Sequence, residues 1–463
     1  MNRKGWWMVC LSLFFQTDIA CGETFLQLQK DRIQKNQPLI LLAESETTTP
    51  LPLQMSEANL KKTTVEKSPL ILLGSYQKAQ IFDPLYRAAL AERDASLIAS
   101  KVAGMAFYPQ LKLSTTQYES ENGQMRWTAT ISQPIINAER FASWREEEPR
   151  VLITGLNLKI KQNELAKRIY KIFSELTMAR EGLSQNKKRI EALEEQWQAG
   201  KRALQLGQGT ITDLRDAEVK VLQAKADNLR LNADLQAAEQ EYESIIGIRT
   251  PQFKLKRQGG SHLVDHIETE GPALNIDNNP ELLLARLSER LGELSAIRAK
   301  SAWIPELNAA YTMTKKGNSS DSYMGFVLSM PVNAGGILGL YSADANLTKL
   351  REESQDKERR IRLNMDHLVN VVHTGGAEVD MRLAAIEAAE LSVDANKKSY
   401  KGGVRTLLDV LGSIEVLYSV KNEFIRSLLN LGDNVINLHL LRGGDVESGL
   451  EMVENMLLDT EIH

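Results

Sequence analysis

Apolar residues recur in alternating steps of four and three along two stretches in the first half of the chain. One stretch covers residues 165–197 and the other covers residues 214–245, and the polar Asn186 and Asn228 each occupy one slot. This spacing is a 3.5-residue period, which predicts helices that pack as coiled-coil partners. A limb of about 60 residues would span roughly 90 Å. Such a length is too great for a compact domain.

Shorter stretches follow a different pattern, with β-forming and partly alternating residues. Residues 111–118 and 126–132 are joined by a polar Glu-Asn-Gly segment, which predicts a first β-hairpin over 111–132. Residues 308–314 and 323–329 predict a second β-hairpin over 308–329, with Lys315, Lys316, Gly317 and Asn318 between its strands. Strands of about 9–11 residues are long enough for a tilted crossing of a bilayer.

The chain is an internal duplication with an offset of about 196 residues. Asp83-Pro84 corresponds to Asn279-Pro280, and each pair predicts a helix start with an N-cap followed by proline. The offsets at later landmarks are similar: Pro109 and Pro305 (305−109 = 196), Pro134 and Pro331 (331−134 = 197), and Asp213 and Asp409 (409−213 = 196). We therefore expect a first repeat at 78–248, a linker at 249–276 and a second repeat at 277–445.

The two ends of the chain differ from the repeats. Arg3 and Lys4 precede an apolar run and small residues near position 22, which predicts a signal peptide at 1–22. Lipidation of Cys21 is the alternative, although Asp18 lies where such signals usually have leucine. Residues 23–77 are predicted to be poorly ordered. Residues 446–463 are predicted to form an acidic tail.

Bulk composition excludes several classes of function. The formal charge of −4 and the pI near 6.0 provide no basic surface for nucleic acid. Only Cys10 and Cys21 are present, so no disulfide framework or thiolate metal site is expected. His262 and His266 are four residues apart, but no further ligands accompany them, so we expect neither metal nor cofactor. The sequence contains no nucleophile–base motif that would indicate an enzyme.

Four membrane-type strands cannot close a barrel, because the smallest closed bacterial barrels have about eight strands. An open edge in lipid would leave backbone groups without hydrogen-bond partners. Several copies must therefore supply strands to one barrel. The helical limbs would then continue below it as a tube in the periplasm.

The duplicated order of helix, proline, two strands, proline and helical hairpin resembles the TolC-type outer-membrane efflux proteins over residues 78–445. The most specific match is residues 400–411, which are similar to the tyrosine–glycine–arginine–threonine–aspartate stretch of TolC; residues 207–213 form the partner stretch. The resemblance implies an α+β membrane protein with long antiparallel coiled-coil hairpins and two β-hairpins per chain. It further implies a homotrimer whose 12-stranded β-barrel is continuous with an α-helical periplasmic barrel.

The same resemblance implies a gate at the periplasmic tip. Arg405 and Asp213 would form a salt bridge, Tyr400 would donate a hydrogen bond to Asp213, and Asp409 would face the axis in an anionic ring. Gly412 stands where TolC has a second aspartate, so we expect a single ring with weaker cation selectivity. The turns at Gly207, Gly209, Gly402 and Gly403 would contact the adaptor. The simpler alternative is that these are ordinary surface charges and turn residues, with Thr406 and Thr212 as helix caps.

The resemblance implies no catalysis but an exit duct in the outer membrane of a Gram-negative bacterium, in contact with its lipid. The partners would be a periplasmic adaptor and an inner-membrane ABC or proton-driven pump. Residues 405–417 are more similar to TolC than to the lipidated drug-efflux branch, which favours type I protein secretion. The alternatives are a duct for multidrug or toxic-compound efflux and a periplasmic coiled-coil scaffold without a pore.

Overall fold

The computed structural model describes most of the chain from residue 71 onward, within one compact unit that spans residues 66–463. The described ranges are 71–117, 125–207, 209–251, 253–257, 259–261, 264, 276–330 and 334–458. The predicted signal peptide, both cysteines, residues 118–124, His262 and His266 lie outside the described residues.

The two helix starts predicted from Asp-Pro and Asn-Pro are confirmed. Helix α2 covers Ile71–Phe82, and α3 covers Pro84–Gly104 with Asp83 as its N-cap. Helix α7 covers Pro280–Ser301 with Asn279 as its N-cap. Each N-cap side chain accepts hydrogen bonds from backbone N–H groups of the first turn, and proline tolerates the first helical position because it has no N–H to satisfy. Short 3₁₀ turns lie at Met105–Phe107 (η2) and Ile276–Asn278 (η4).

The four strands form one antiparallel sheet in the order β1-β2-β3-β4. Their bounds are Gln110–Gln117, Met125–Ile136, Glu306–Lys316 and Ser319–Ser329. The sequence predicted that a proline closes the first hairpin, but Pro134 lies inside β2, and the register with β3 shifts between Pro134 and Ile136. A proline fits there because a bulge already interrupts the ladder of backbone hydrogen bonds.

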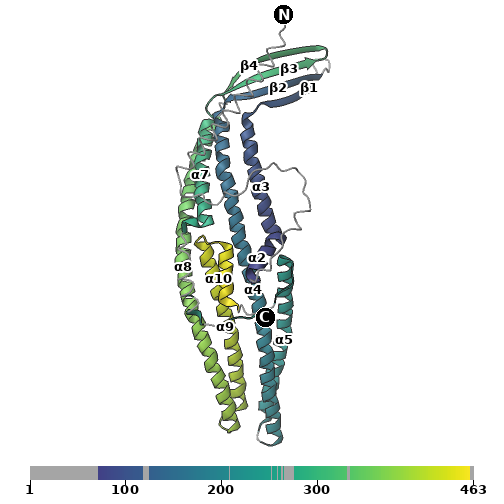
Figure 1. The fold of residues 1–463 in the computed structure, drawn as a ribbon, viewed down its shortest axis with the longest axis vertical. Coiled ribbons are helices and arrows are strands. Elements are labelled where there is room, and N and C mark those ends of the chain that lie inside the picture. The colour runs from purple at the N-terminus through teal and green to yellow at the C-terminus, as the bar shows by residue number, and fades with distance from the viewer. Residues whose placement is uncertain are drawn as a thin grey trace. The chain divides into compact units, whose positions relative to one another are not determined.

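Two pairs of long helices follow the two hairpins (Figure 1). Helix α4 covers Ala138–Gln205 and returns as α5 at Ile211–Ile246; α8 covers Ala334–Lys401 and returns as α9 at Leu407–Leu441. The predicted limb of about 60 residues is confirmed, since α4 and α8 have 68 residues each. At 1.5 Å per residue, each is about 100 Å long. Near the turns the packed neighbours form the row α5, α4, α9, α8, and near the sheet they form the row α3, α4, α7, α8.

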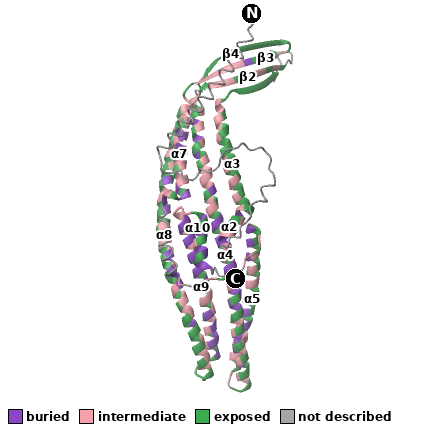
Figure 2. Ribbon diagram, viewed as in Figure 1, coloured by how far each residue is buried: buried purple, intermediate pink, exposed green. Residues whose placement is uncertain are grey.

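Most of the predicted acidic tail at 446–463 is a helix, which corrects the sequence prediction, and residues 459–463 lie outside the described residues. Residues Val446–Leu457 form helix α10, which packs against α9, α2 and α4 (Figure 2). Leu450, Val453, Met456 and Leu457 recur at helical spacing and are buried, while two of the three glutamates of α10 are exposed. The prediction of poor order over 23–77 is wrong at its end, because Leu72 and Tyr76 are buried parts of α2; residues 23–70 lie outside the described residues.

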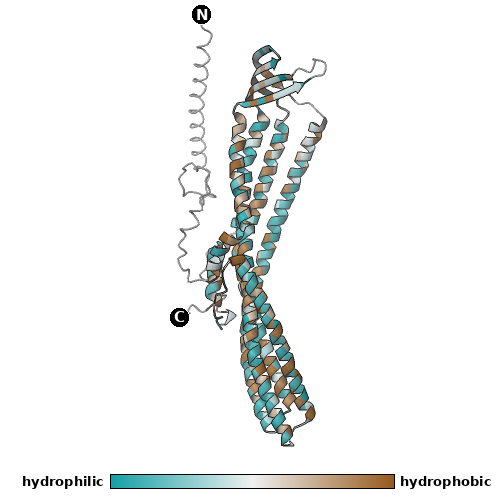
Figure 3. Ribbon diagram, turned by 90° about the vertical axis from the view of Figure 1, so that its right-hand side faces the viewer, coloured by the Kyte–Doolittle hydropathy of each residue, from teal (hydrophilic) through white to brown (hydrophobic). Residues whose placement is uncertain are grey.

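Hydrophilic and hydrophobic residues are mixed along the long helices (Figure 3). This mixture is expected of helices that bury one face and expose another. Within the described ranges, no helix has a stretch that is both long and apolar enough to cross a bilayer.

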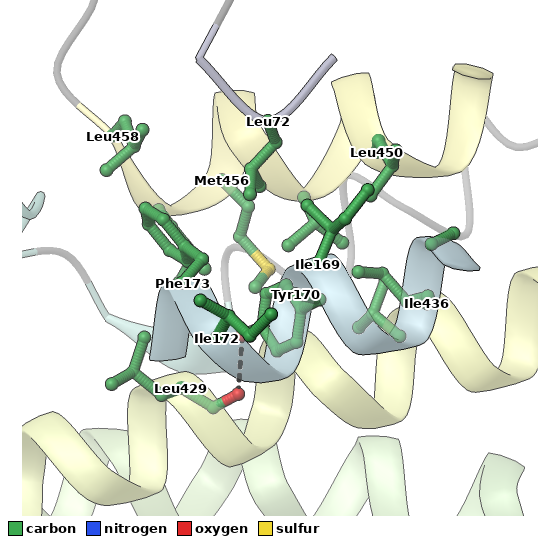
Figure 4. Packing of buried hydrophobic residues seen from close by; sticks show 14 of the residues in the cluster. Leu72, Ile169, Tyr170, Ile172, Phe173, Leu429, Ile436, Leu450, Met456 and Leu458 are labelled. Carbon is green, nitrogen blue, oxygen red and sulfur yellow. Dashed lines mark hydrogen bonds between the residues drawn. The ribbon is translucent and has the colours of Figure 1, made fainter. Parts of the chain in front are cut away.

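The main hydrophobic core lies where α2, α4, α9 and α10 meet (Figure 4). Tyr170 on α4 is fully buried, and its hydroxyl donates a 2.6 Å hydrogen bond to the carbonyl oxygen of Leu429 on α9. Burial raises the pKa of Tyr170 well above its ordinary value. Gly432 lets the ring approach so closely, since a Cβ there would lie 2.2 Å from the Tyr170 hydroxyl oxygen. This core ties the first hairpin to the second at the level of α10.

Candidate functional site

The sheet has one apolar and one polar face. Cross-strand partners share a face, so the registers assign Leu111 and Ile131 to the same side as Tyr311 and Met324. Phe326 and Leu328 lie on this side too, and both are largely exposed. The opposite side carries polar cross-strand partners, among them Lys112, Thr130, Thr312 and Thr314, and Thr130 and Thr312 are 3.3 Å apart between hydroxyl oxygens.

The sheet is joined to the helices by a polar cluster. Asn137 is the N-cap of α4, and its amide nitrogen donates a 2.6 Å hydrogen bond to Oε2 of Glu306 at the start of β3. The other oxygen of Glu306 accepts a 2.6 Å hydrogen bond from the hydroxyl of Ser329 at the end of β4. One carboxylate thus ties the ends of two strands to the start of a helix about 100 Å long.

At the far end of the long helices the two hairpins turn in similar ways. Gly207 and Gly403 have positive φ values of 72° and 74°, which glycine adopts without strain. After α8, the Val404 N–H bonds to the Ser399 carbonyl and the Gly403 N–H bonds to the Tyr400 carbonyl. This arrangement is a Schellman-type helix end. The predicted turn residues Gly207, Gly209, Gly402 and Gly403 therefore occupy the two turns.

A threonine and an aspartate cap each returning helix. Thr210 caps α5 and Thr406 caps α9, each accepting from the backbone N–H of the aspartate three residues later. In turn, Asp213 accepts a 2.7 Å hydrogen bond from the Thr210 hydroxyl, and Asp409 accepts one of 2.8 Å from the Thr406 hydroxyl. The prediction of Thr212 as a cap was wrong. The Thr-x-x-Asp spacing of a capping box was the available signal.

Arg405 pairs with Asp409 in this single chain, not with Asp213. The guanidinium Nη1 lies 3.7 Å from Oδ1 of Asp409, and both side chains are exposed. Hydrogen bonds from the backbone and hydroxyl of Thr406 lower the pKa of Asp409, and the charge of Arg405 adds to the effect. Both residues line a groove of 340 Å³ between α8 and α9, together with Ser392 and Asn396. Asp409 therefore remains a carboxylate at neutral pH.

Tyr400 lies between the two hairpins. It packs against the second apolar cluster, which is formed by residues of α4, α5 and α9. Burial raises the pKa of Tyr400, and the charge of Asp213 on α5 raises it further. The charge of Asp213 thus acts on Tyr400 across the two hairpins, while the expected hydrogen bond between them stays a prediction.

Two further contacts near the turns were not predicted. Gly200 on α4 faces Leu407, where an added Cβ would lie 2.8 Å from Leu407 Cδ2. The ammonium of Lys397 on α8 lies 3.0 Å from Oε2 of Glu195 on α4. Neither contact has a signal in the sequence, since each joins residues about 200 positions apart whose pairing depends on how the hairpins pack.

Comparison with known proteins assigns this arrangement to a family. The profile described as "Outer membrane efflux protein" matches residues 75–247 and 272–444, which are the two repeats. The chain is 23% identical over 414 residues to the alkaline protease secretion protein AprF of Pseudomonas aeruginosa, covering 82% of this chain and 86% of AprF. It is 24% identical to the proteases secretion protein PrtF of Dickeya chrysanthemi, covering 76% and 83%. It is 23% identical to the outer membrane protein TolC of Escherichia coli, covering 83% and 85%.

Solved structures share the fold. The outer membrane protein VceC of Vibrio cholerae superimposes with a TM-score of 0.68 at 14% identity, covering 81% of this chain and 96% of VceC. The open state of the MtrE outer membrane channel of Neisseria gonorrhoeae gives a TM-score of 0.65 at 14% identity, covering 81% and 89%.

These relatives are outer membrane channel proteins, not enzymes, and their helical portion lies in the periplasm of Gram-negative bacteria. The same localisation and the same absence of catalysis apply to this chain. Its two repeats account for both matches of the profile, and the matched residues make up most of its length. The chain belongs to the outer membrane efflux protein family.

Proposed function

We propose that this exit duct serves type I protein secretion, as the outer-membrane component of a tripartite export machine. The observation that carries the proposal is the likeness, over more than three quarters of this chain, to two proteins named for protease secretion. Channels of this family are trimers that work with an adaptor and an inner-membrane pump. That the cargo is a secreted protein and that the pump belongs to a type I system are parts of this proposal.

The helix row supports assembly from identical copies. In the row α5, α4, α9, α8, the two inner helices have a row neighbour on each side, while α5 and α8 are the two ends of the row. Each end helix carries an exposed apolar seam with steps of three and four. The seam of α5 is Val219, Leu222, Ala226, Leu229 and Ala233, and the seam of α8 is Met381, Ala384, Ala388, Leu391 and Ala395.

The two seams are complementary. Helix α5 leaves its turn and α8 approaches its own turn, so α5 of one copy and α8 of the next would lie antiparallel. Counted from the turns, Leu222 and Leu391 lie at similar heights, as do Leu229 and the small Ala384. Such a contact joins unlike surfaces and generates a closed ring when the rotation between copies closes.

The sheet supports the same mode of assembly. Strands β1 and β4 are at its two edges, and β1 belongs to the first repeat while β4 belongs to the second. Pairing of β4 with β1 of the next copy would satisfy the backbone groups at both edges. The apolar face would then contact lipid and the polar face would line the duct.

The gate residues belong to this proposal as well. The predicted salt bridge from Arg405 to Asp213 and the hydrogen bond from Tyr400 to Asp213 would form in the closed duct, whereas in this single chain Arg405 pairs with Asp409. Asp409 would supply one carboxylate per copy to an anionic constriction. Exposed charge pairs are weak, about a kcal/mol or less. The binding of an adaptor at the glycine turns is therefore sufficient to release them.

A duct for small toxic molecules is the second candidate, since one relative is named the outer membrane efflux protein BepC of Brucella suis. Deletion of this chain in its own bacterium distinguishes the two. We expect the loss of one or more secreted proteins from the medium, with unchanged ethidium accumulation and unchanged resistance to toxic compounds. The wild-type chain supplied in trans should restore secretion.

Intact secretion with raised ethidium accumulation would assign the chain to small-molecule efflux instead. Purified protein in a planar bilayer provides a second criterion. A folded protein extracted from membranes that shows no conductance, even with Arg405→Ser, would favour the periplasmic scaffold.

A further inference from the structure

The interface between the two hairpins consists of two separate apolar clusters. On α4, the main core ends at Leu176 and the second cluster begins at Leu193; on α9, Phe424 belongs to the main core and Ile414 to the second cluster. The chain is described throughout these stretches, and no buried member of either cluster lies between those limits. The parts of the two hairpins nearer the turns, their lower parts, are therefore held together by the second cluster, separately from the main core.

Between the clusters a polar network, hereafter the polar gap, is centred on Arg189 of α4. The same stretch also holds three buried apolar residues that belong to neither cluster: Ala179, Leu183 and Leu417. The Arg189 side chain is 17% exposed and bonds in two directions. Its Nη2 lies 2.7 Å from Oε2 of Glu415 on α9, and its Nε lies 3.2 Å from Oε1 of the same carboxylate. Its Nη1 lies 3.0 Å from Oδ2 of Asp227 on α5. We call these two contacts the arms of Arg189. The arm to Glu415 joins the two hairpins, while the arm to Asp227 stays within the first hairpin.

The packing around Arg189 is incomplete. A groove of 660 Å³ lies between α4, α5 and α9, with Asn186, Arg189, Glu415 and Asn422 in its lining. One turn before Arg189, the buried Gln185 has an Oε1 atom that accepts no hydrogen bond from any described residue. A buried acceptor without a partner weakens the packed arrangement. The groove also weakens the packing, because the atoms that line it have fewer dispersion contacts.

We propose that Arg189 is a positioning residue for the periplasmic aperture, holding the lower part of the second hairpin against the first through Glu415. The polar gap is the level at which the two hairpins separate when the duct opens. Above it the main core, with Tyr170 and Leu429, keeps the hairpins together. Below it only the second cluster and the Lys397–Glu195 ion pair, among the described residues, oppose separation. The link to opening rests on the proposed duct function, whereas the hinge itself does not.

The two arms of Arg189 provide a matched test. Glu415→Gln weakens the arm between the hairpins, and Asp227→Asn weakens the arm within the first hairpin by the same chemical change. Spin labels at the exposed Ile211 and Val404, near the two turns, report the separation of the hairpins in the purified full chain. Thermal unfolding shows whether both variants are folded to the same extent.

We expect Glu415→Gln to shift the label distances towards a longer, broader distribution, while Asp227→Asn retains the wild-type distribution. In planar bilayers, Glu415→Gln should raise the open-to-closed ratio about tenfold, which corresponds to ~1.4 kcal/mol. Equal effects of both variants, or no effect of Glu415→Gln on the distances, would overturn the proposal. Changed distances in a protein that never conducts would support the hinge and refute the duct.

Discussion

At the residue scale, the residues at the two turns stabilise the single chain and remain able to contact other copies. Asp409 completes the capping box of α9 with Thr406 and pairs with Arg405, although the family resemblance assigned it to an axial ring. The two roles are compatible, because a capping carboxylate keeps its charge. One turn later, Gly412 leaves open space, since a Cβ there would meet no atom within 4 Å.

We predict that Gly412→Asp raises the cation selectivity of the duct. The added carboxylate would lie one turn from Asp409 and double the acidic groups that each copy supplies to the constriction. The fold should tolerate it, because glycine inside a helix is less favourable than most residues, by up to about 1 kcal/mol. The measurement is the reversal potential in a salt gradient across a planar bilayer.

Gly412→Asn is the uncharged control, and its reversal potential should equal that of the wild type. An unchanged reversal potential for Gly412→Asp would place Asp409 and its neighbours away from the conduction path.

At the scale of elements, α10 fastens several distant segments of the chain to one another. The carboxylate of Glu454 accepts hydrogen bonds from the N–H groups of Ile71, Leu72 and Leu73, at 2.7 Å for Leu72. It therefore caps the start of α2. The end of α10 also accepts a 2.8 Å hydrogen bond from the Lys256 N–H in the linker between the repeats.

We predict that Glu454→Ala speeds amide hydrogen exchange at Leu72 and Leu73 by about tenfold or more, because unpaired buried donors cost ~1–3 kcal/mol. Glu451→Ala is the control, since Glu451 is exposed on the same helix. Exchange measured by mass spectrometry on peptides that cover α2 tests both variants. Equal protection in wild type and Glu454→Ala would show that α2 does not depend on this cap.

The same residue predicts a pH dependence. Burial raises the pKa of Glu454 above 4.5, although the three backbone N–H groups oppose the shift. A raised folded-state pKa means that the stabilising contribution is complete below the unfolded value and is lost as the pH rises through the folded value. Relative to Glu454→Gln, which does not titrate, wild-type α2 should gain protection as the pH falls from 7 towards about 5. Identical pH profiles would contradict this.

At the scale of the whole molecule, the described part of the chain presents unlike edges at its two sides. Helix α5 and strand β1 lie at the first-repeat edge, and α8 and β4 lie at the second-repeat edge. An internal duplication explains this arrangement, because each repeat supplies two neighbouring strands and one helical hairpin. The surfaces that remain exposed are those through which the next copy would attach.

We predict that cysteines at Leu222 and Leu391 form disulfides between copies. Because every copy carries both positions, oxidation of the double variant should yield a covalent ladder that ends at three chains on a denaturing gel. Each single variant should remain monomeric, since a head-to-tail contact never brings identical positions together. Disulfide dimers from a single variant would instead indicate a two-fold contact.

Much of this architecture follows from local patterns. The 3.5-residue period predicted the coiled-coil limbs, the proline after Asp83 or Asn279 predicted two helix starts, and the alternating runs predicted the strands. Those signals are readable because each reflects interactions within a few residues. The same reasoning located the turns at Gly207 and Gly403, whereas the resemblance to a known family drew attention to Asp213, Tyr400, Arg405 and Asp409.

The sequence by itself determined the elements, the duplication and the candidate turn residues, because hydrophobic periodicity and capping chemistry are local. Only the tertiary structure decided which distant groups meet. The fastening of α2 by Glu454, the burial of α10, and the bonding of Arg189 to both Glu415 and Asp227 depend on how helices pack across hundreds of residues. Such contacts depend on the shape of the assembled core, which a pattern of neighbouring residues does not specify.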